Sequence, residues 1–151
     1  MQFIIHVSTF LTNSKNQILC VKEKKEQVFN KLNLPGGHLE IGEGLIEGAK
    51  REAKEEIGVE VEIEALIGVY TGFGKDHYIH FVFSGKIIKG TPSANKSEIN
   101  DFGWYSEEEI QKMPEIQILN PDKLKKVIAD YKSGSVGSLD LITEMINPNS
   151  R

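Results

Sequence analysis

The amino-acid sequence predicts an α/β (α+β) fold in which a mixed β-sheet lies between α-helices. Three observations lead to this prediction. Strand-forming runs occur in both halves of the chain, and one of them, at 59–70, begins by alternating apolar residues with glutamate. Residues 44–57, between the two groups of strands, carry apolar side chains at helical spacing, and further helical patterns close the chain. This order of elements favours a mixed sheet over a regular parallel array.

Length and composition describe one ordinary globular domain. The chain has 151 residues, of which 39% are hydrophobic and 26% charged, and such a chain can bury a core. We expect a single cytoplasmic domain over 1–151, because the opening MQFIIHVSTFL lacks the basic start and cleavage site of a signal peptide. No apolar run approaches the roughly 20 residues of a membrane span. The formal net charge of −4 gives no support to a nucleic-acid partner.

The first part of the chain predicts strands joined by polar turns. Residues 2–11 and 17–23 are rich in strand formers, and TNSKN between them predicts a hairpin. The charged run KEKKEQVFNK then indicates a loop or a hairpin end, which leads to LNLP and the glycine pair at 36–37. Cys20 is the only cysteine and lies in the apolar run ILCV, so we expect a buried strand residue and no internal disulfide.

Residues 44–57 predict an amphipathic helix with an acidic face, and Gly58 supplies the stop signal. The apolar stripe recurs at spacings of three and four, at Ile46, Ala49, Ala53 and Ile57. At about 100° per residue, Glu52, Glu55 and Glu56 fall within a sector of roughly 100° beside that stripe. Carboxylates one turn apart repel each other. They are therefore either all in water or close to a cation such as Mg²⁺, which prefers oxygen ligands.

The second half of the chain predicts three more strands and two helices. After the alternating strand, the loop TGFGKDH leads to the strand YIHFVFSGKII, and the loop GTPSANKS leads to the short strand INDFGWY. SEEEIQKM opens with a serine N-cap and an acidic first turn, which predicts a short helix. A second amphipathic helix begins at Pro121. The last dozen residues indicate a short helix or a frayed tail.

Residues 37–59 resemble the signature of the Nudix hydrolase family, in its compact MutT-like group. In that signature a glycine is followed after five residues by glutamate. Seven residues further come Arg-Glu, an apolar residue, any residue, Glu-Glu, any residue, glycine and an apolar residue. The matching positions are Gly37, Glu43, Arg51, Glu52, Ala53, Glu55, Glu56, Gly58 and Val59. The only soft match is Ala53, which is small for an apolar position.

The resemblance implies a Nudix fold and hydrolysis of a phosphoanhydride bond. The substrate would be a nucleoside di- or triphosphate, or a nucleoside diphosphate linked to another group. The implied cofactor is Mg²⁺, with Mn²⁺ as a substitute, and the implied ligands are Glu52, Glu55, Glu56 and the carbonyl oxygen of Gly37. Glu43 and Arg51 would orient the loop and the helix, because an arginine fork can bind a carboxylate with two hydrogen bonds. Gly37 and Gly58 would permit tight turns at either end.

The residues expected to take part in catalysis are Arg51, Glu52, Glu55 and Glu98. Glu52 is the first choice for the base that takes a proton from the attacking water. Glu98, in the loop SANKSEIN, is the second choice. Glu98 would otherwise be a further metal ligand or a plain surface residue.

Several other side chains are candidates for contacts with a base or a phosphate, and each also has a structural explanation. They are Lys22 or Lys24, His38, Tyr70, Phe73, Tyr78, His77 and His80. Alternation along HYIHF predicts that His77 and His80 point to opposite faces. The alternative function is a non-catalytic ligand sensor with the same fold, although the complete set of box glutamates favours an enzyme. The exact substrate and the oligomeric state are left open.

Overall fold

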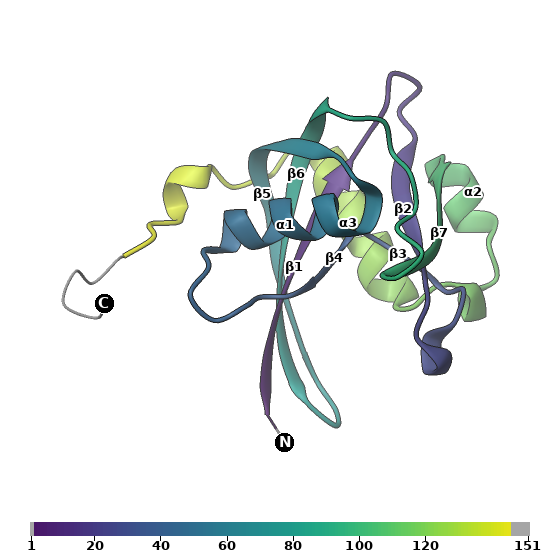
Figure 1. Cartoon of the computed structure of the whole chain (residues 1–151), viewed down its shortest axis with the longest axis horizontal. Coiled ribbons are helices and arrows are strands. Elements are labelled where there is room, and N and C mark those ends of the chain that lie inside the picture. The colour runs from purple at the N-terminus through teal and green to yellow at the C-terminus, as the bar shows by residue number, and fades with distance from the viewer. Residues whose placement is uncertain (1, 146–151) are drawn as a thin grey trace.

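The computed structural model describes residues 2–145, which form two β-sheets with helices packed against them (Figure 1). The strands are β1 (Phe3–Leu11), β2 (Ile18–Glu23), β3 (Leu32–Asn33), β4 (Gly36–His38), β5 (Glu60–Phe73), β6 (His77–Lys89) and β7 (Ile99–Tyr105). The α-helices are α1 (Leu45–Ile57), α2 (Glu107–Lys112) and α3 (Pro121–Ser133). Short 3-10 helices lie at Glu26–Val28, Glu115–Gln117 and Leu139–Leu141. The helix or frayed tail predicted for the last dozen residues lies partly outside the described residues.

The larger sheet is mixed, as the sequence predicts. Its strand order is β4-β1-β6-β5, in which β1 and β6 run parallel and the other two pairs are antiparallel. A second sheet with the order β3-β2-β7 is antiparallel throughout. The predicted mixed sheet between helices is confirmed, and the separate three-stranded sheet is an addition to it.

The hairpin predicted from residues 2–11 and 17–23 does not form as a paired ladder. TNSKN makes the turn, but only one bridge, between Thr12 and Ile18, joins the two sides before the strands enter different sheets. β1 has both edges occupied by β4 and β6, and β2 has both edges occupied by β3 and β7. Pairing with these distant strands places the C-terminal half of β1 in the buried interior.

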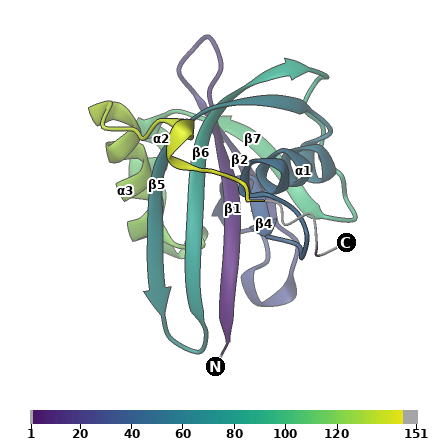
Figure 2. The same cartoon turned by 90° about the vertical axis from the view of Figure 1, so that its left-hand side faces the viewer.

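Helices α1 and α3 cover opposite faces of the mixed sheet (Figure 2). Ala53 and Ile57 of α1 share one buried core with Leu11 of β1. Val127 of α3 shares a second buried core with Phe10, the neighbour of Leu11. Successive residues of a strand point to opposite faces, so β1 contributes to both cores. No helix within residues 2–145 combines the length and the apolar character needed to cross a membrane.

The helix boundaries agree with the sequence signals. Gly58 ends α1 in the left-handed conformation, at φ 71°, and its N–H bonds to the carbonyl of Lys54. Ser106 caps α2 in a reciprocal capping box with Glu109. The loop predicted at TGFGKDH is shorter than expected, because β5 and β6 stay paired as far as Phe73.

The N-terminus of α1 is capped by a residue from the end of the chain. Gly44 at the N-cap makes no side-chain hydrogen bond. Instead, the backbone N–H of Leu45 donates to Oε1 of Glu144 at 3.0 Å. A Cβ on Gly44 would lie 2.8 Å from the Glu144 carboxyl group, so the glycine leaves room for this contact. The same tail is tied to β5 by two backbone hydrogen bonds between Leu66 and Gly137.

Replacing Glu144 with alanine is expected to lower the free energy of unfolding by about 0.5–1 kcal/mol, because α1 loses an acceptor and a negative charge at its N-terminus. Glu144→Gln keeps an acceptor and should lose less. Urea denaturation measures both variants, with Thr143→Ala at the exposed neighbouring position as the control. Equal midpoints for Glu144→Ala and the control would contradict the proposed cap.

Candidate active site

One cavity collects charged and polar side chains from segments that are far apart in the sequence. Its volume is about 760 Å³. Its lining includes Glu52 and Glu56 of α1, Gly36, Gly37 and His38 of β4, His6 and Ser8 of β1, His80 of β6, Lys123 of α3 and the loop residues Lys75 and Glu98. Most of the predicted site residues are therefore brought together. Glu55 is exposed and is not part of this lining.

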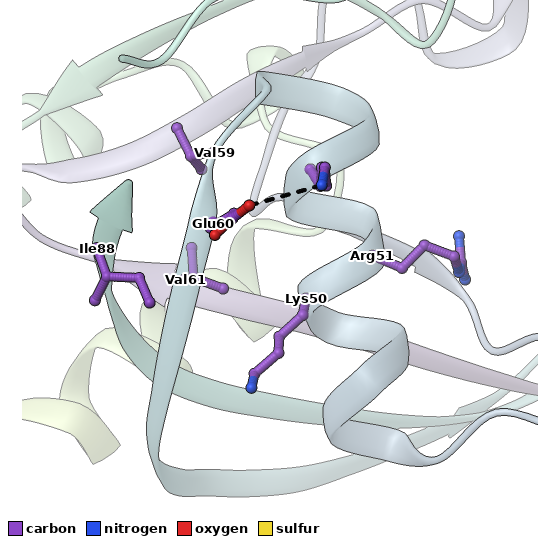
Figure 3. Close-up of a pocket in the computed structure, with 7 residues that line it drawn as sticks. Lys50, Arg51, Val59, Glu60, Val61 and Ile88 are labelled. Atoms are coloured by element: carbon purple, nitrogen blue, oxygen red, sulfur yellow. Dashed lines mark ion pairs between the residues drawn. The ribbon is translucent and has the colours of Figure 1, made fainter. Parts of the chain in front are cut away.

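A smaller cavity between α1 and β5 has a different character. It has a volume of about 300 Å³, and its lining includes Lys50, Val61 and Ile88 (Figure 3). The predicted site residue Arg51 lines this cavity and not the larger one. Lys54 and Glu60, which also line it, form an ion pair with an N–O distance of 3.8 Å (Figure 3). This lining is mostly basic and apolar, so the acidic chemistry of α1 belongs to the larger cavity.

Arg51 is the hub of the acidic face. Its guanidinium binds Glu43 with two hydrogen bonds, from Nε at 2.9 Å and from Nη2 at 2.7 Å, which is the bidentate contact expected from the sequence. Nη2 also donates to the carbonyl oxygen of His38 at 3.0 Å. Nη1 donates to Glu52 and to Glu55, at 3.0 Å each. One side chain thus connects the loop before α1, strand β4 and two box glutamates.

Two of the carboxyl groups in the cavity are held in surroundings that disfavour their negative charge. Glu56 is only 5% exposed, and its Oε1 accepts a hydrogen bond from the N–H of Gly36 at 2.6 Å. Burial raises the pKa of Glu56 to about 9. Burial also raises the pKa of Glu52, although its contact with Arg51 works in the other direction. The charge of Glu98 adds to both increases, so a nearby cation would stabilise this group of acids.

Gly36 and Gly37 allow the strand and the helix to approach closely. A Cβ on Gly37 would lie 2.5 Å from Oε1 of Glu52, and one on Gly36 would lie 2.1 Å from Oγ of Ser8. The expectation that Gly37 permits a tight turn is wrong, because this residue lies within β4. Its missing side chain makes room for the Glu52 carboxylate instead. Gly58 does have the turn conformation expected of it.

The donor atoms of this cavity fit a hard divalent cation. Carboxylate and backbone carbonyl oxygens are the ligands that such cations prefer, and the cavity holds Glu52, Glu56 and Gly37 together. Within residues 2–145, no three or more His, Cys, Asp or Glu side chains already form a group that could hold a metal ion. Arg51 pairs with Glu52 and Glu55 instead. The ligand set inferred from the sequence therefore stays a proposal.

The two histidines of β6 have different surroundings, as alternation predicts. His80 is 3% exposed and lines the cavity, where Nε2 lies 2.7 Å from Oγ of Ser8. His77 packs against the rings of Phe3 and Phe73, with centroid distances of 4.9 Å and 5.6 Å. His80 is thus part of the candidate site, and His77 belongs to an aromatic cluster outside the cavity lining.

The aromatic candidates for base stacking lie outside the cavity lining. The hydroxyl of Tyr70 donates to Asp130 at 2.7 Å, and Phe73 is 82% exposed. Tyr78 lies under the ammonium group of Lys123, at 5.5 Å from the ring centroid. The stacking role that the sequence left open for these rings therefore stays a prediction.

The charged run that begins at the end of β2 contributes a lysine other than the two predicted. Nζ of Lys24 donates to the carbonyl oxygen of Lys96 at 2.6 Å, and Lys22 lines a separate pocket. Lys25, which follows directly, lines the candidate site.

Sequence reasoning missed Ser8, His6 and Lys123. Lys123 did carry a signal, because it stands four residues before Val127 and therefore at the border of the apolar stripe of α3. Ser8 and His6 lie in a mostly apolar strand, where nothing in the sequence indicates which partner they face.

Comparisons with known proteins point to one family. The NUDIX domain model matches residues 3–128. A Methanocaldococcus jannaschii protein named ADP-ribose pyrophosphatase is 38% identical over 78 residues, which are 50% of this chain and 46% of that protein. A Bacillus subtilis protein named provisionally as an 8-oxo-dGTP diphosphatase is 33% identical over 125 residues, 82% of this chain and 76% of its own. The solved NUDIX hydrolase from Nitrosomonas europaea has a TM-score of 0.84 at 29% identity, over 94% of this chain and 97% of its own. The match to the archaeal protein thus spans less than half of that protein.

Replacing Arg51 with methionine is expected to lower the free energy of unfolding by about 2 kcal/mol at neutral pH, because charged hydrogen bonds to Glu43 are lost. Arg51 lowers the pKa of Glu43. The contribution is therefore present above the ordinary glutamate pKa and disappears as the pH falls through the lowered value. Denaturant titrations at neutral and acidic pH measure this difference between wild type and variant.

The control for this substitution is Lys54→Met on the same helix, which removes only a longer, exposed ion pair. It should cost less than about 0.5 kcal/mol at either pH. A stability difference between wild type and Arg51→Met that does not shrink in acid would show that the Glu43 pair is not its source.

Proposed function

We propose that this chain, which belongs to the Nudix family, hydrolyses a phosphoanhydride bond with the help of a divalent metal ion. The substrate would be a nucleoside di- or triphosphate, or a nucleoside diphosphate linked to another group. The observation that carries the proposal is the meeting of Glu52 and Glu56 with Glu98 in one cavity, beside the backbone of Gly37. Carboxylate oxygens of Glu52 and Glu56 and the carbonyl oxygen of Gly37 are ligands of the kind that such a cation prefers, and Glu98 lines the same cavity.

The proposed cofactor is Mg²⁺, with Mn²⁺ as a substitute. The residues that would hold it are Glu52, Glu55, Glu56 and the carbonyl oxygen of Gly37. When bound, such an ion supplies positive charge against the phosphate oxygens and makes water easier to deprotonate. The raised pKa values of the half-buried Glu52 and the buried Glu56 support this proposal, because a cation offsets the cost of their charge.

The side chains of α1 would divide the work as follows. Glu52 is the proposed general base, since burial moves its pKa towards the range in which a carboxylate takes a proton near neutral pH. Arg51 is a positioning residue, because it reaches Glu52 with one edge and is itself fixed by Glu43 with the other. Glu98 is the second candidate for the base, and its place in the cavity supports that choice.

The alternative is a non-catalytic sensor that binds nucleotides with the same fold. One observation favours it, namely that Arg51 already pairs with Glu52 and Glu55. A sensor needs no complete metal site, whereas the hydrolase needs these carboxylates to be available to the cation.

Phosphate release from a panel of nucleotides, with and without Mg²⁺, discriminates the two functions. The panel should include ADP-ribose and 8-oxo-dGTP, for which two relatives are named, together with ordinary nucleoside di- and triphosphates, dinucleoside polyphosphates and thiamine diphosphate. We expect turnover with Mg²⁺ and its loss with EDTA. Absence of turnover on every compound at micromolar protein would favour the sensor.

Glu56→Gln is expected to lower Mg²⁺-dependent turnover about a hundredfold or more and to weaken metal binding, because a proposed ligand loses its charge. Metal-free melting should show no loss of stability, since the amide oxygen can still accept from Gly36 and repulsion with the neighbouring acids falls. Glu43→Gln is the matched comparison and should affect turnover less, because Glu43 acts through Arg51. Near-normal turnover of the Glu56→Gln variant would show that Glu56 is not a metal ligand.

A further inference from the structure

We propose that Lys123, held by His80 and Ser8, is an anion-binding site that receives the terminal phosphate of the substrate. That the anion is a phosphate of the substrate rests on the proposed function. The inference adds a cation supplied by α3 to a cavity whose proposed metal ligands Glu52 and Glu56 come from α1.

Lys123 is the outer member of a buried hydrogen-bonded chain. Its Nζ lies 2.9 Å from Nδ1 of His80, and Nε2 of His80 lies 2.7 Å from Oγ of Ser8. An ammonium group can only donate. Nδ1 therefore accepts from Lys123, and Nε2 carries the proton that is donated to Ser8. His80 and Ser8 are 3% and 2% exposed, so both are fixed by the surrounding core.

The neutral state of His80 suits this arrangement. Burial, followed by the charges of Lys123 and His6, lowers the pKa of His80 to about 2. Burial likewise lowers the pKa of His6 to about 4. Both rings beside Lys123 are therefore uncharged near neutral pH. His80 orients the ammonium group and His6 packs near it, and neither compensates its charge.

Lys123 differs from the other lysines of α3 in having no acidic partner. Lys125, Lys126 and Lys132 each form an ion pair, with Glu115, Asp130 and Glu107 respectively. Among residues 2–145, Lys123 forms no such pair. Its ammonium group lines the cavity above the ring of Tyr78 instead. A partly buried cation that lacks a counter-charge is stabilised by an anion.

Burial also lowers the pKa of Lys123 to about 8. An anion bound at Nζ would stabilise the charged form, so binding and protonation would support each other.

The chemistry of the ammonium group favours a terminal phosphate over an internal diphosphate. Nζ is a compact point charge with three donors, of which one is used by His80. A terminal phosphate carries about two negative charges near neutral pH and offers three unshared oxygens. Each phosphorus of an internal diphosphate carries one charge and two unshared oxygens. We therefore expect Lys123 to favour substrates that end in a phosphate.

Calorimetric titration of the full chain with inorganic pyrophosphate, in EDTA and again with Mg²⁺, tests the site without turnover. Lys123→Met should weaken binding about ten- to a hundredfold, the size expected for a charged hydrogen bond. Lys123→Arg keeps the charge and should retain most of the affinity. The control is Lys125→Met, which removes a lysine of the same helix outside the cavity lining and should bind as wild type.

The outcomes separate this inference from the proposed function. Pyrophosphate affinity that is unchanged in Lys123→Met, or undetectable in wild type under both conditions, would overturn the site, even in a chain that hydrolyses nucleotides. Conversely, the chain could bind pyrophosphate through Lys123 and yet show no turnover. That result would support the site and contradict only the proposed hydrolase function.

The same assay with ATP and with ADP-ribose tests the preference for a terminal phosphate. Lys123→Met should weaken ATP binding at least about tenfold and ADP-ribose binding less than about threefold. Equal losses for the two ligands would overturn the assignment to a terminal phosphate.

The positioning role of His80 is tested by a double-mutant cycle. His80→Leu should weaken pyrophosphate binding, and combining it with Lys123→Met should add little further loss, because both act through one ammonium group. Thermal melting confirms that each variant is folded. Additive losses would show that His80 does not act through Lys123.

Discussion

The arrangement of the site depends on one arginine placed on an acidic helix. Two glutamates that α1 brings close together, Glu52 and Glu55, would repel each other, and Nη1 of Arg51 lies between their carboxylates. The remaining donors of the same fork hold Glu43 and the carbonyl of His38. The Arg51 side chain therefore does two things at once. It offsets negative charge on the acidic face of α1, and it attaches the helix to its loop and to β4. This coupling keeps the acids clustered before any cation arrives.

A second constraint is that the first two residues of β4, Gly36 and Gly37, have no side chains. Gly36 and Gly37 let β4 lie against Ser8 on one neighbour and against the Glu52 carboxylate on another. The N–H of Gly36 also donates to Glu56, which draws this acid into the interior. Burial of a carboxylate is unfavourable unless its charge is compensated. An affinity for protons or cations thus follows from the packing of α1 on β4.

Local sequence patterns predicted the longer strands, the α-helices and much of the acidic site, while long-range packing decided the rest, including the short strands β3 and β4. The apolar stripe at 44–57 predicted α1. The resemblance to the Nudix signature identified Arg51 and its bidentate partner Glu43. The separation of β1 from β2 was not predictable, because β1 takes its partners from strands that are distant in the sequence. Gly37 was misjudged because its role depends on a side chain 15 positions later, which only the tertiary fold brings near. Lys123 stands at the border of the apolar stripe of α3, but only the docking of α3 shows that its partner is His80.

The mixed sheet fixes the relation between the two charged parts of the cavity. The helices α1 and α3 pack on opposite faces of this sheet (Figure 2), and β1 and β6 stay in register from Phe3 opposite His77 to Leu11 opposite Gly85. Ser8 and His80, the supports of Lys123, belong to these two paired strands. In the proposed complex a phosphate chain meets a cation held by carboxylates at one point and an ammonium group at another. Because a paired sheet hardly stretches, the span between those points would select the length of the phosphate chain.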